Sequence, residues 1–170
     1  SYYNKITKRV LKNSFEILKS IRTELSINLS TLDIENDETR ELIYSLLENN
    51  KKDRNRLVFE LLEDERVKDF SSIKVFIKKV KSMGVSIAID DFGAGYSNFE
   101  RLLEFEPDLL KIDGSLIKNI ITDKYSQNIV ETIVAFAKRQ NIKTIAEYVE
   151  NKEIFDYLNN LGIDYSQGYY

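Results

Sequence analysis

The sequence contains no cysteine and no histidine among its 170 residues. Without cysteine the chain cannot form a disulfide, a thiolate nucleophile or a thiolate zinc site, and without histidine it has neither an imidazole base nor an imidazole metal ligand. Acid–base chemistry must therefore use Asp, Glu, Lys or Tyr. A metal site built from these side chains would be rich in oxygen ligands, which favours Mg²⁺, Mn²⁺ or Ca²⁺ over zinc or copper.

Basic clusters and long apolar runs are also missing. The net charge is -3 and the 25 Lys and Arg residues are scattered, so we expect no nucleic-acid binding. No apolar run approaches the roughly 20 residues that span a bilayer, and the start of the chain, SYYNKITKRV, lacks the apolar core of a signal peptide. We therefore expect a cytoplasmic segment without membrane contact, although the protein that contains it could be membrane-anchored.

The composition, with 42% hydrophobic and 31% charged residues over 170 positions, suits one globular domain. Apolar periodicity predicts six short strands that alternate with helices. In the predicted first helix, over about the first twenty residues, Ile6, Val10, Ile17 and Ile21 recur at helical spacing, flanked by Leu11, Phe15 and Leu18. The predicted strands are LSINLS ending at Ser30, Leu57–Leu62, Val85–Asp90, Leu109–Asp113, Ile142–Ala146 and Ile163–Gln167.

Strands that alternate with helices through short loops indicate right-handed parallel crossovers, and hence a parallel α/β sheet with helices outside. Spacing alone leaves open an open doubly wound sheet or part of a (β/α)₈ barrel. A barrel assembles its site from the ends of many strands, whereas a doubly wound sheet binds at one switch point. Polar residues follow nearly every predicted strand, which favours the barrel: Asn28, Glu60, Asp90, Asp91, Lys111, Asp113, Glu147, Glu150 and Gln167.

Each of these residues alone could be a solvated loop residue or a helix cap. As a set they suggest chemistry, because Asn28, Glu60 and Lys111 lie inside otherwise apolar strands, where a polar side chain is costly without a function. Converging carboxylates repel one another. One or two divalent ions held by Asn28, Glu60, Asp90 and Glu147 would neutralise them, which predicts phosphoester hydrolysis. Lys111 could then hold the attacking water or, if desolvated, accept its proton.

Six motifs follow one another along the chain: SINLS, VFELLE, IDDFGAGYS, LLKIDGSLI, TIAEYVE and SQGYY. Together they resemble the EAL domain family, bacterial phosphodiesterases that linearise the second messenger cyclic di-GMP. The resemblance implies a modified (β/α)₈ barrel and two bound Mg²⁺ or Mn²⁺ ions. It also implies hydrolysis of one phosphodiester bond of cyclic di-GMP, which yields linear pGpG.

The resemblance further implies roles for the matched residues. Lys111 would position the attacking water and Glu147 would bind metal, so these two are the predicted catalytic residues. The implied metal ligands are Asn28, Glu60, Asp90, Asp91 and Glu147. The residues expected to contact substrate or support the site are Glu63, which would hold the loop after Asp91 in shape, Asp113, Glu150 and Gln167. The loop 92–98 resembles the family's dimer-coupling element, which implies a two-fold homodimer.

The sequence departs from the family pattern in two respects. Tyr148 stands where the family usually has Gly, and the Glu-Ala-Leu motif, which supplies a metal-binding Glu from the first barrel strand, does not occur. Only about six of eight strands are recognisable. We therefore expect residues 1–170 to be one EAL-type domain without its first strand region and C-terminal end. It would be cropped or cleaved from a longer protein, or completed by a neighbouring chain.

Three function classes follow from these patterns. The first is a phosphodiesterase, in which the longer protein hydrolyses cyclic di-GMP and carries a sensor or GGDEF-type domain upstream, while the 170-residue piece itself is expected to have little or no activity. The second is a non-catalytic cyclic di-GMP receptor with the same pocket. The third, a purely structural module, is disfavoured by the retained strand-end residues. A protein kinase reading of Asp91, Phe92 and Gly93 fails because no His-Arg-Asp catalytic loop occurs.

Overall fold

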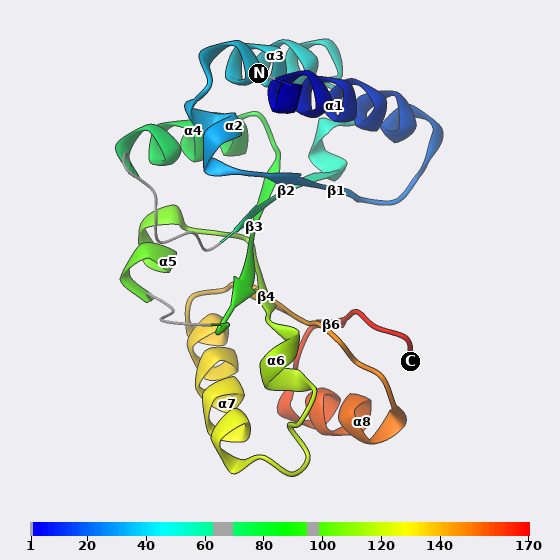
Figure 1. Ribbon diagram of the computed structural model, residues 1–170, viewed down its shortest axis with the longest axis vertical. Coiled ribbons are helices and arrows are strands. Elements are labelled where there is room, and N and C mark those ends of the chain that lie inside the picture. Colours follow the sequence, from blue (N-terminus) through cyan, green and yellow to red (C-terminus); the bar gives the residue numbers. More distant parts are fainter. Residues whose placement is uncertain (1, 63–69, 95–98) are drawn as a thin grey trace. The chain divides into compact units, whose positions relative to one another are not determined.

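The computed structural model describes residues 2–62, 70–94 and 99–170, and in these ranges helices alternate with strands (Figure 1). The chain forms two compact units, Ser1–Ile87 (unit 1) and Ala88–Tyr170 (unit 2). No described helix combines the length and the apolar character that a bilayer crossing requires. In chain order the elements are α1 (Tyr2–Ser20), β1 (Leu25–Leu29), α2 (Thr31–Glu35), α3 (Asp37–Asn49), the 3₁₀ turn η1 (Arg54–Arg56), β2 (Leu57–Leu62), α4 (Phe70–Ser82), β3 (Ser86–Phe92), α5 (Phe99–Phe105), β4 (Leu109–Ile112), α6 (Gly114–Ile117), α7 (Lys124–Arg139), β5 (Lys143–Ala146), α8 (Lys152–Leu161) and β6 (Tyr165–Ser166).

Unit 1 is built on two parallel strands, β1 and β2, with helices packed around them. The register places Asn28 opposite Glu60. Helices α1 and α3 lie side by side (Figure 1), and α2 contacts both α3 and α4. Phe59 of β2 and Phe76 of α4 are fully buried, with ring centroids 6.2 Å apart, so an aromatic pair joins this sheet to its helix.

Helix α1 confirms the first predicted helix, but its buried stripe differs from the expected one. Leu11, Phe15 and Leu18 are at most 1% exposed. Three of the four residues expected to define the stripe, Ile6, Val10 and Ile17, are instead between 48% and 50% exposed. Both sets have helical spacing, so periodicity identifies the helix, and only the packing partner decides which stripe is buried.

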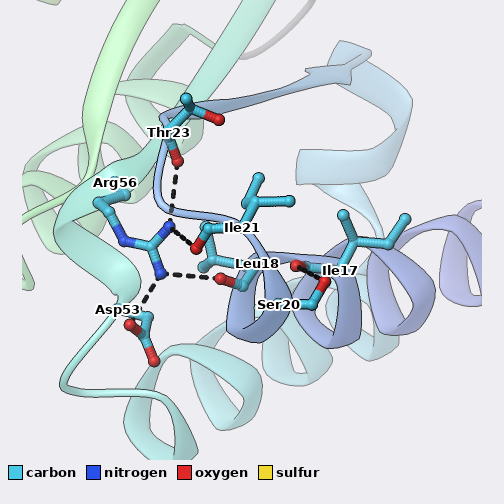
Figure 2. Close-up of polar contacts among 7 residues, drawn as sticks. All are labelled: Ile17, Leu18, Ser20, Ile21, Thr23, Asp53 and Arg56. Carbon is cyan, nitrogen blue, oxygen red and sulfur yellow. Dashed lines mark hydrogen bonds and ion pairs between the residues drawn. The ribbon is translucent and has the colours of Figure 1, made fainter.

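The C-terminal end of α1 is held by one side chain from η1, Arg56 (Figure 2). Its guanidinium donates hydrogen bonds to the backbone oxygens of Leu18 at 2.7 Å, Ile21 at 2.8 Å and Thr23 at 3.0 Å. It also pairs with Asp53 at 2.8 Å. The last carbonyls of a helix have no partner within the helix, and Arg56 satisfies that of Leu18. Its hydrogen bonds to Ile21 and Thr23 fix the turn that leads into β1.

A five-residue helix, α2, follows β1 where the sequence predicted only the end of a strand. Ser30 lies outside β1 and is the N-cap of α2. Its hydroxyl accepts from the Asp33 N–H at 3.2 Å, and the Asp33 carboxylate accepts from the Ser30 N–H at 2.9 Å. This reciprocal capping box accounts for the short helix. The next helix, α3, is capped by Asn36, whose side chain accepts from the Thr39 N–H at 2.9 Å.

Unit 2 is built on four parallel strands in sequence order, from β3 to β6. The register places Leu110 opposite Thr144. Helix α7 contacts both α6 and β5. The ring of Phe99 packs edge-to-face against Phe92 of β3 and Phe136 of α7, with ring centroids 5.3 and 4.8 Å apart. The predicted parallel strands with packed helices are therefore confirmed.

Several predicted boundaries in unit 2 are shifted. β3 runs to Phe92, two residues beyond the predicted Asp90, and β6 covers only Tyr165–Ser166 of the predicted Ile163–Gln167. Asp113 is not the last residue of β4, because its carboxylate accepts from the Ser115 N–H at 2.9 Å and caps α6. Helix α8 ends at Gly162, which adopts the left-handed φ of 86° that suits glycine.

Candidate active site

Strand β3 ends in a bulge that carries Asp90 and Asp91. Ile89 pairs with Leu110 and Phe92 pairs with Ile112, so β3 advances three residues where β4 advances two. Asp91 adopts the left-handed φ of 55°. Consecutive side chains of a regular strand point to opposite faces, and a bulge breaks that alternation. As a result, carboxylate oxygens of Asp90 and Asp91 lie within 4.8 Å of each other and of Glu147.

Lys111 of β4 lies between two carboxylates. Its ammonium Nζ is 2.8 Å from Asp90 Oδ1 and 2.8 Å from Glu147 Oε1. Lys111 is 6% exposed and Asp90 9%. A buried charge is costly unless it is paired, so the trio forms as a unit. Glu147 is held beside β4 because its backbone N–H donates to the Ile112 oxygen at 3.2 Å.

Two carboxyl groups of the acidic cluster, Asp91 and Glu147, have raised pKa values although Lys111 lies beside them. Burial raises the pKa of Asp91, and the charges of Asp90 and Asp113 raise it further. Burial also raises the pKa of Glu147, against the opposing hydrogen bond and charge of Lys111 and with added repulsion from Asp90 and Asp91. Three carboxylates within 4.8 Å offer hard oxygen ligands, and the raised pKa values indicate that one lysine does not neutralise them.

An open depression of about 680 Å³ lies next to Glu147. It contains two further predicted residues, Asp113 and Gln167. Gln167 follows β6, and its backbone N–H donates to the Ala146 oxygen at 2.8 Å. Gly168 must be glycine here, since a Cβ would come within 2.1 Å of the Val149 carbonyl oxygen. The full lining is Asp113, Gly114, Ser115, Lys118, Glu147, Tyr148, Gln167, Gly168 and Tyr169.

The other predicted residues are distributed as follows. Asn28 and Glu60 face each other across the β1–β2 pair in unit 1, so the structure brings these two together. Glu150 is exposed on the loop after Glu147. Glu63 and the loop positions 95–98, which were expected to shape the site and couple a dimer, lie outside the described residues.

Gly93 follows the bulge, and its conformation explains why the sequence Asp91-Phe92-Gly93 ends in glycine. It adopts a φ of 99°, and a Cβ at this position would lie 2.4 Å from Leu116 Cδ1. The turn therefore requires glycine on two grounds, backbone angle and space. The Asp113 N–H donates to the Phe92 oxygen at 3.0 Å, which ties this turn to the start of α6.

Sequence reasoning did not include the residues that line the depression from α6, chiefly Ser115 and Lys118. Helix α6 has four residues, too few to show a periodic apolar stripe. The available signal was Asp113 followed by Gly and Ser, a capping sequence directly after a predicted strand. Tyr148 was singled out because it stands where the family usually has Gly, next to Glu147.

Comparison with known proteins identifies the family. The EAL domain family model matches residues 1–170, the whole chain. The chain belongs to the EAL domain family. It is 41% identical over 114 residues to the cyclic di-GMP phosphodiesterase PdeF of Escherichia coli (strain K12), a match that covers 67% of this chain and 15% of PdeF. It is 34% identical over 144 residues to the cyclic di-GMP phosphodiesterase PdeA of Borreliella burgdorferi, covering 85% and 22%.

Solved EAL structures share its fold. The cyclic di-GMP-bound standalone EAL protein of Vibrio cholerae O395 matches with a TM-score of 0.84 at 31% identity, covering 97% of this chain and 71% of that one. The EAL domain of Mycobacterium smegmatis DcpA matches with a TM-score of 0.87 at 25% identity, covering 99% and 79%. The predicted EAL-type fold is therefore confirmed. The chain spans between about 15% and 22% of the two curated relatives named above.

Proposed function

We propose that this EAL domain acts in bacterial second-messenger signalling and that the protein containing it hydrolyses cyclic di-GMP to linear pGpG. The observation that carries the proposal is the buried Lys111, paired at 2.8 Å with both Asp90 and Glu147 beside Asp91. Relatives named as cyclic di-GMP phosphodiesterases and a cyclic di-GMP-bound EAL structure support the choice of substrate.

The oxygen-only ligand set fits a hard divalent cation, Mg²⁺ or Mn²⁺, and the predicted number is two. Asp90, Asp91 and Glu147 would hold metal in unit 2. When bound, such ions activate water and neutralise phosphate oxygens. The raised pKa values of Asp91 and Glu147 support this role, because a nearby cation favours their ionised forms.

Lys111 has two possible roles, to hold the attacking water or to accept its proton. An ammonium between two carboxylates is favoured in its charged form, which donates hydrogen bonds but cannot accept a proton. We therefore assign Lys111 the water-holding role. Its two ion pairs fix the direction of the ammonium beside the proposed metal ligands.

The remaining roles stay predictions. Asn28 and Glu60 are proposed as further metal ligands from their motifs and from their facing positions on β1 and β2. Asp113, Glu150, Gln167 and Glu63 are proposed to contact substrate or support the site. We also propose a homodimer through the 92–98 loop, a sensor or GGDEF-type domain elsewhere in the protein, and a cytoplasmic location. The related MucR of Pseudomonas aeruginosa is named a bifunctional diguanylate cyclase and cyclic di-GMP phosphodiesterase.

The test is hydrolysis of cyclic di-GMP by the full-length protein in Mg²⁺ or Mn²⁺, with pGpG separated by chromatography. We expect Lys111→Ala and Glu147→Gln each to reduce turnover by at least about 100-fold, the scale of a lost positioning or acid–base group. The matched control is Lys152→Ala, which removes an exposed lysine paired with Asp156 on α8. Near-normal turnover in Lys111→Ala would contradict the role given to this residue.

The alternative is a receptor that binds cyclic di-GMP without cutting it. The Glu-Ala-Leu motif does not occur within these 170 residues, so a direct comparison is required. Calorimetric binding of cyclic di-GMP by the full-length protein, with no pGpG formed in either metal, would favour the receptor. Turnover would favour the enzyme.

A further inference from the structure

Tyr148, immediately after Glu147, has an unusual backbone. Its φ is 62°, in the left-handed region that residues with a Cβ rarely adopt. Such a conformation persists only where the surroundings enforce it, and it occurs preferentially at functional sites. A smaller residue could connect the chain at this position with less strain. The tyrosine side chain is therefore expected to have a role of its own.

Two neighbours hold the tyrosine side chain in place. It lies against Gly114, where a Cβ would come within 2.9 Å of Tyr148 Cβ and 3.3 Å of its Cγ. The ammonium of Lys118 lies over the ring, 5.4 Å from the centroid, at cation–π distance. The missing side chain of residue 114 thus makes room for the ring, and Lys118 orients it.

The ring of Tyr148 does not pack in the hydrophobic core. Tyr148 is 44% exposed and lines the open depression together with Glu147, Lys118 and Gln167. An aromatic face and an ammonium beside an acidic cluster are complementary to a nucleotide, which offers a base to stack on and phosphates to pair with. The aromatic surface adjoins the carboxylate that takes part in the proposed chemistry.

We propose that Tyr148 contacts the substrate by stacking its ring on a guanine base of cyclic di-GMP, with Lys118 as the residue that positions the ring. This inference rests on the proposed function of the site. It gives Tyr148 a role in substrate affinity and none in the bond-breaking step. The expected signature is a change in KM with little change in kcat.

The test uses three variants of Tyr148 and one control variant in the full-length protein. Tyr148→Phe keeps the ring, and its KM should stay within about two-fold of the wild type. Tyr148→Leu removes the stacking surface and should raise KM about ten-fold, within the range measured for lost base–aromatic stacking, with kcat within about three-fold. The control, Tyr125→Leu, removes a 71% exposed tyrosine on α7 that does not line the depression, and its kinetics should not change.

A structural role would give a different pattern. If Tyr148 served packing alone, Tyr148→Leu would lower Tm and leave KM unchanged, which would overturn the proposal. The third variant, Tyr148→Gly, relieves the left-handed strain. Its Tm should equal or exceed that of the wild type, and its KM should rise as in Tyr148→Leu.

Binding in EDTA separates this inference from the proposed function. If the wild type binds cyclic di-GMP without hydrolysing it, the enzyme proposal fails, and an approximately ten-fold weaker Kd in Tyr148→Leu would still support stacking. If the wild type hydrolyses cyclic di-GMP and Tyr148→Leu matches it in both Kd and KM, the stacking proposal fails and the proposed function stands. If the wild type neither binds nor hydrolyses it, both proposals fall.

Discussion

Asp91 combines a left-handed backbone with a raised pKa, and both features come from its place in the bulge of β3. Burial and the charges of Asp90 and Asp113 make its ionised form unfavourable in the metal-free fold. Because the folded-state pKa lies above the ordinary value of 3.8, the residue favours folding below that value. The benefit is lost as the pH rises through the folded-state pKa.

We predict that Asp91→Asn raises the free energy of unfolding of the metal-free protein at pH 7, by up to about 1 kcal/mol after solvent screening. Asparagine tolerates the left-handed conformation, so the charge is the main change. The gain should shrink as the pH falls through the raised pKa of Asp91, because the wild-type carboxyl then loses its charge. Urea titration in EDTA at pH 4, 5.5 and 7 checks this.

The control for this prediction is Glu24→Gln, which removes an exposed carboxylate in unit 1 and should be neutral across the same pH range. A less stable Asp91→Asn protein at pH 7 would contradict the electrostatic account. It would indicate that the carboxylate makes a stabilising contact that outweighs its repulsion from Asp90 and Asp113.

At this scale the sequence predicted that Asp90, Lys111 and Glu147 gather, but not how they do so. Asp90, Lys111 and Glu147 were recognisable because each follows or interrupts an apolar strand, and the structure places all three in direct contact. The bulge that turns Asp91 toward them was not predictable, because one extra residue in a strand leaves no trace in apolar alternation. The strain at Tyr148 is likewise visible only in the backbone angles.

At the scale of elements, the end of α1 depends on Arg56 from η1 (Figure 2). Three carbonyl oxygens and the Asp53 carboxylate accept from a single guanidinium, a geometry that a lysine ammonium cannot reproduce. We predict that Arg56→Lys lowers the free energy of unfolding by about 1 kcal/mol and Arg56→Ala by about 2 kcal/mol. Chemical denaturation followed by circular dichroism provides the measurement.

The matched control is Arg22→Ala, which removes an exposed arginine from the same turn and should change stability by less than about 0.5 kcal/mol. Equal effects of Arg56→Ala and Arg22→Ala would show that the hydrogen bonds to Leu18, Ile21 and Thr23 do not hold the turn.

The strands and the longer helices were predicted from the sequence, whereas the shortest helices were not. The strand β2 matches its predicted bounds, Leu57–Leu62, because a run that is apolar except for Glu60 stands out between polar stretches of sequence. Helices α2 and α6 have five and four residues, less than two turns, so they carry no periodic stripe. Their only sequence signals were the caps Ser30 and Asp113, which also fit the end of a strand.

At the scale of the whole molecule, family membership gives the fold, and the site chemistry must be tested by ligand binding. The chain is matched over its full length by the EAL domain family model, yet it spans only part of each relative. Metal binding is the property that links the acidic cluster to the activity of the complete protein. It can be measured without substrate, because a ligand that binds only the folded state stabilises it.

We predict that Mg²⁺ or Mn²⁺ stabilises the full-length protein and that this gain requires Glu147. At a free metal concentration about 100 times Kd, one site adds about 2.7 kcal/mol. Glu147→Gln should lose most of the rise in Tm, whereas Glu153→Gln, an exposed acid in the first turn of α8, should keep it. The rise should also shrink at acidic pH, because protons compete for carboxylates whose pKa values are raised. Equal stabilisation of both variants would place the metal elsewhere and remove Glu147 from the proposed ligand set.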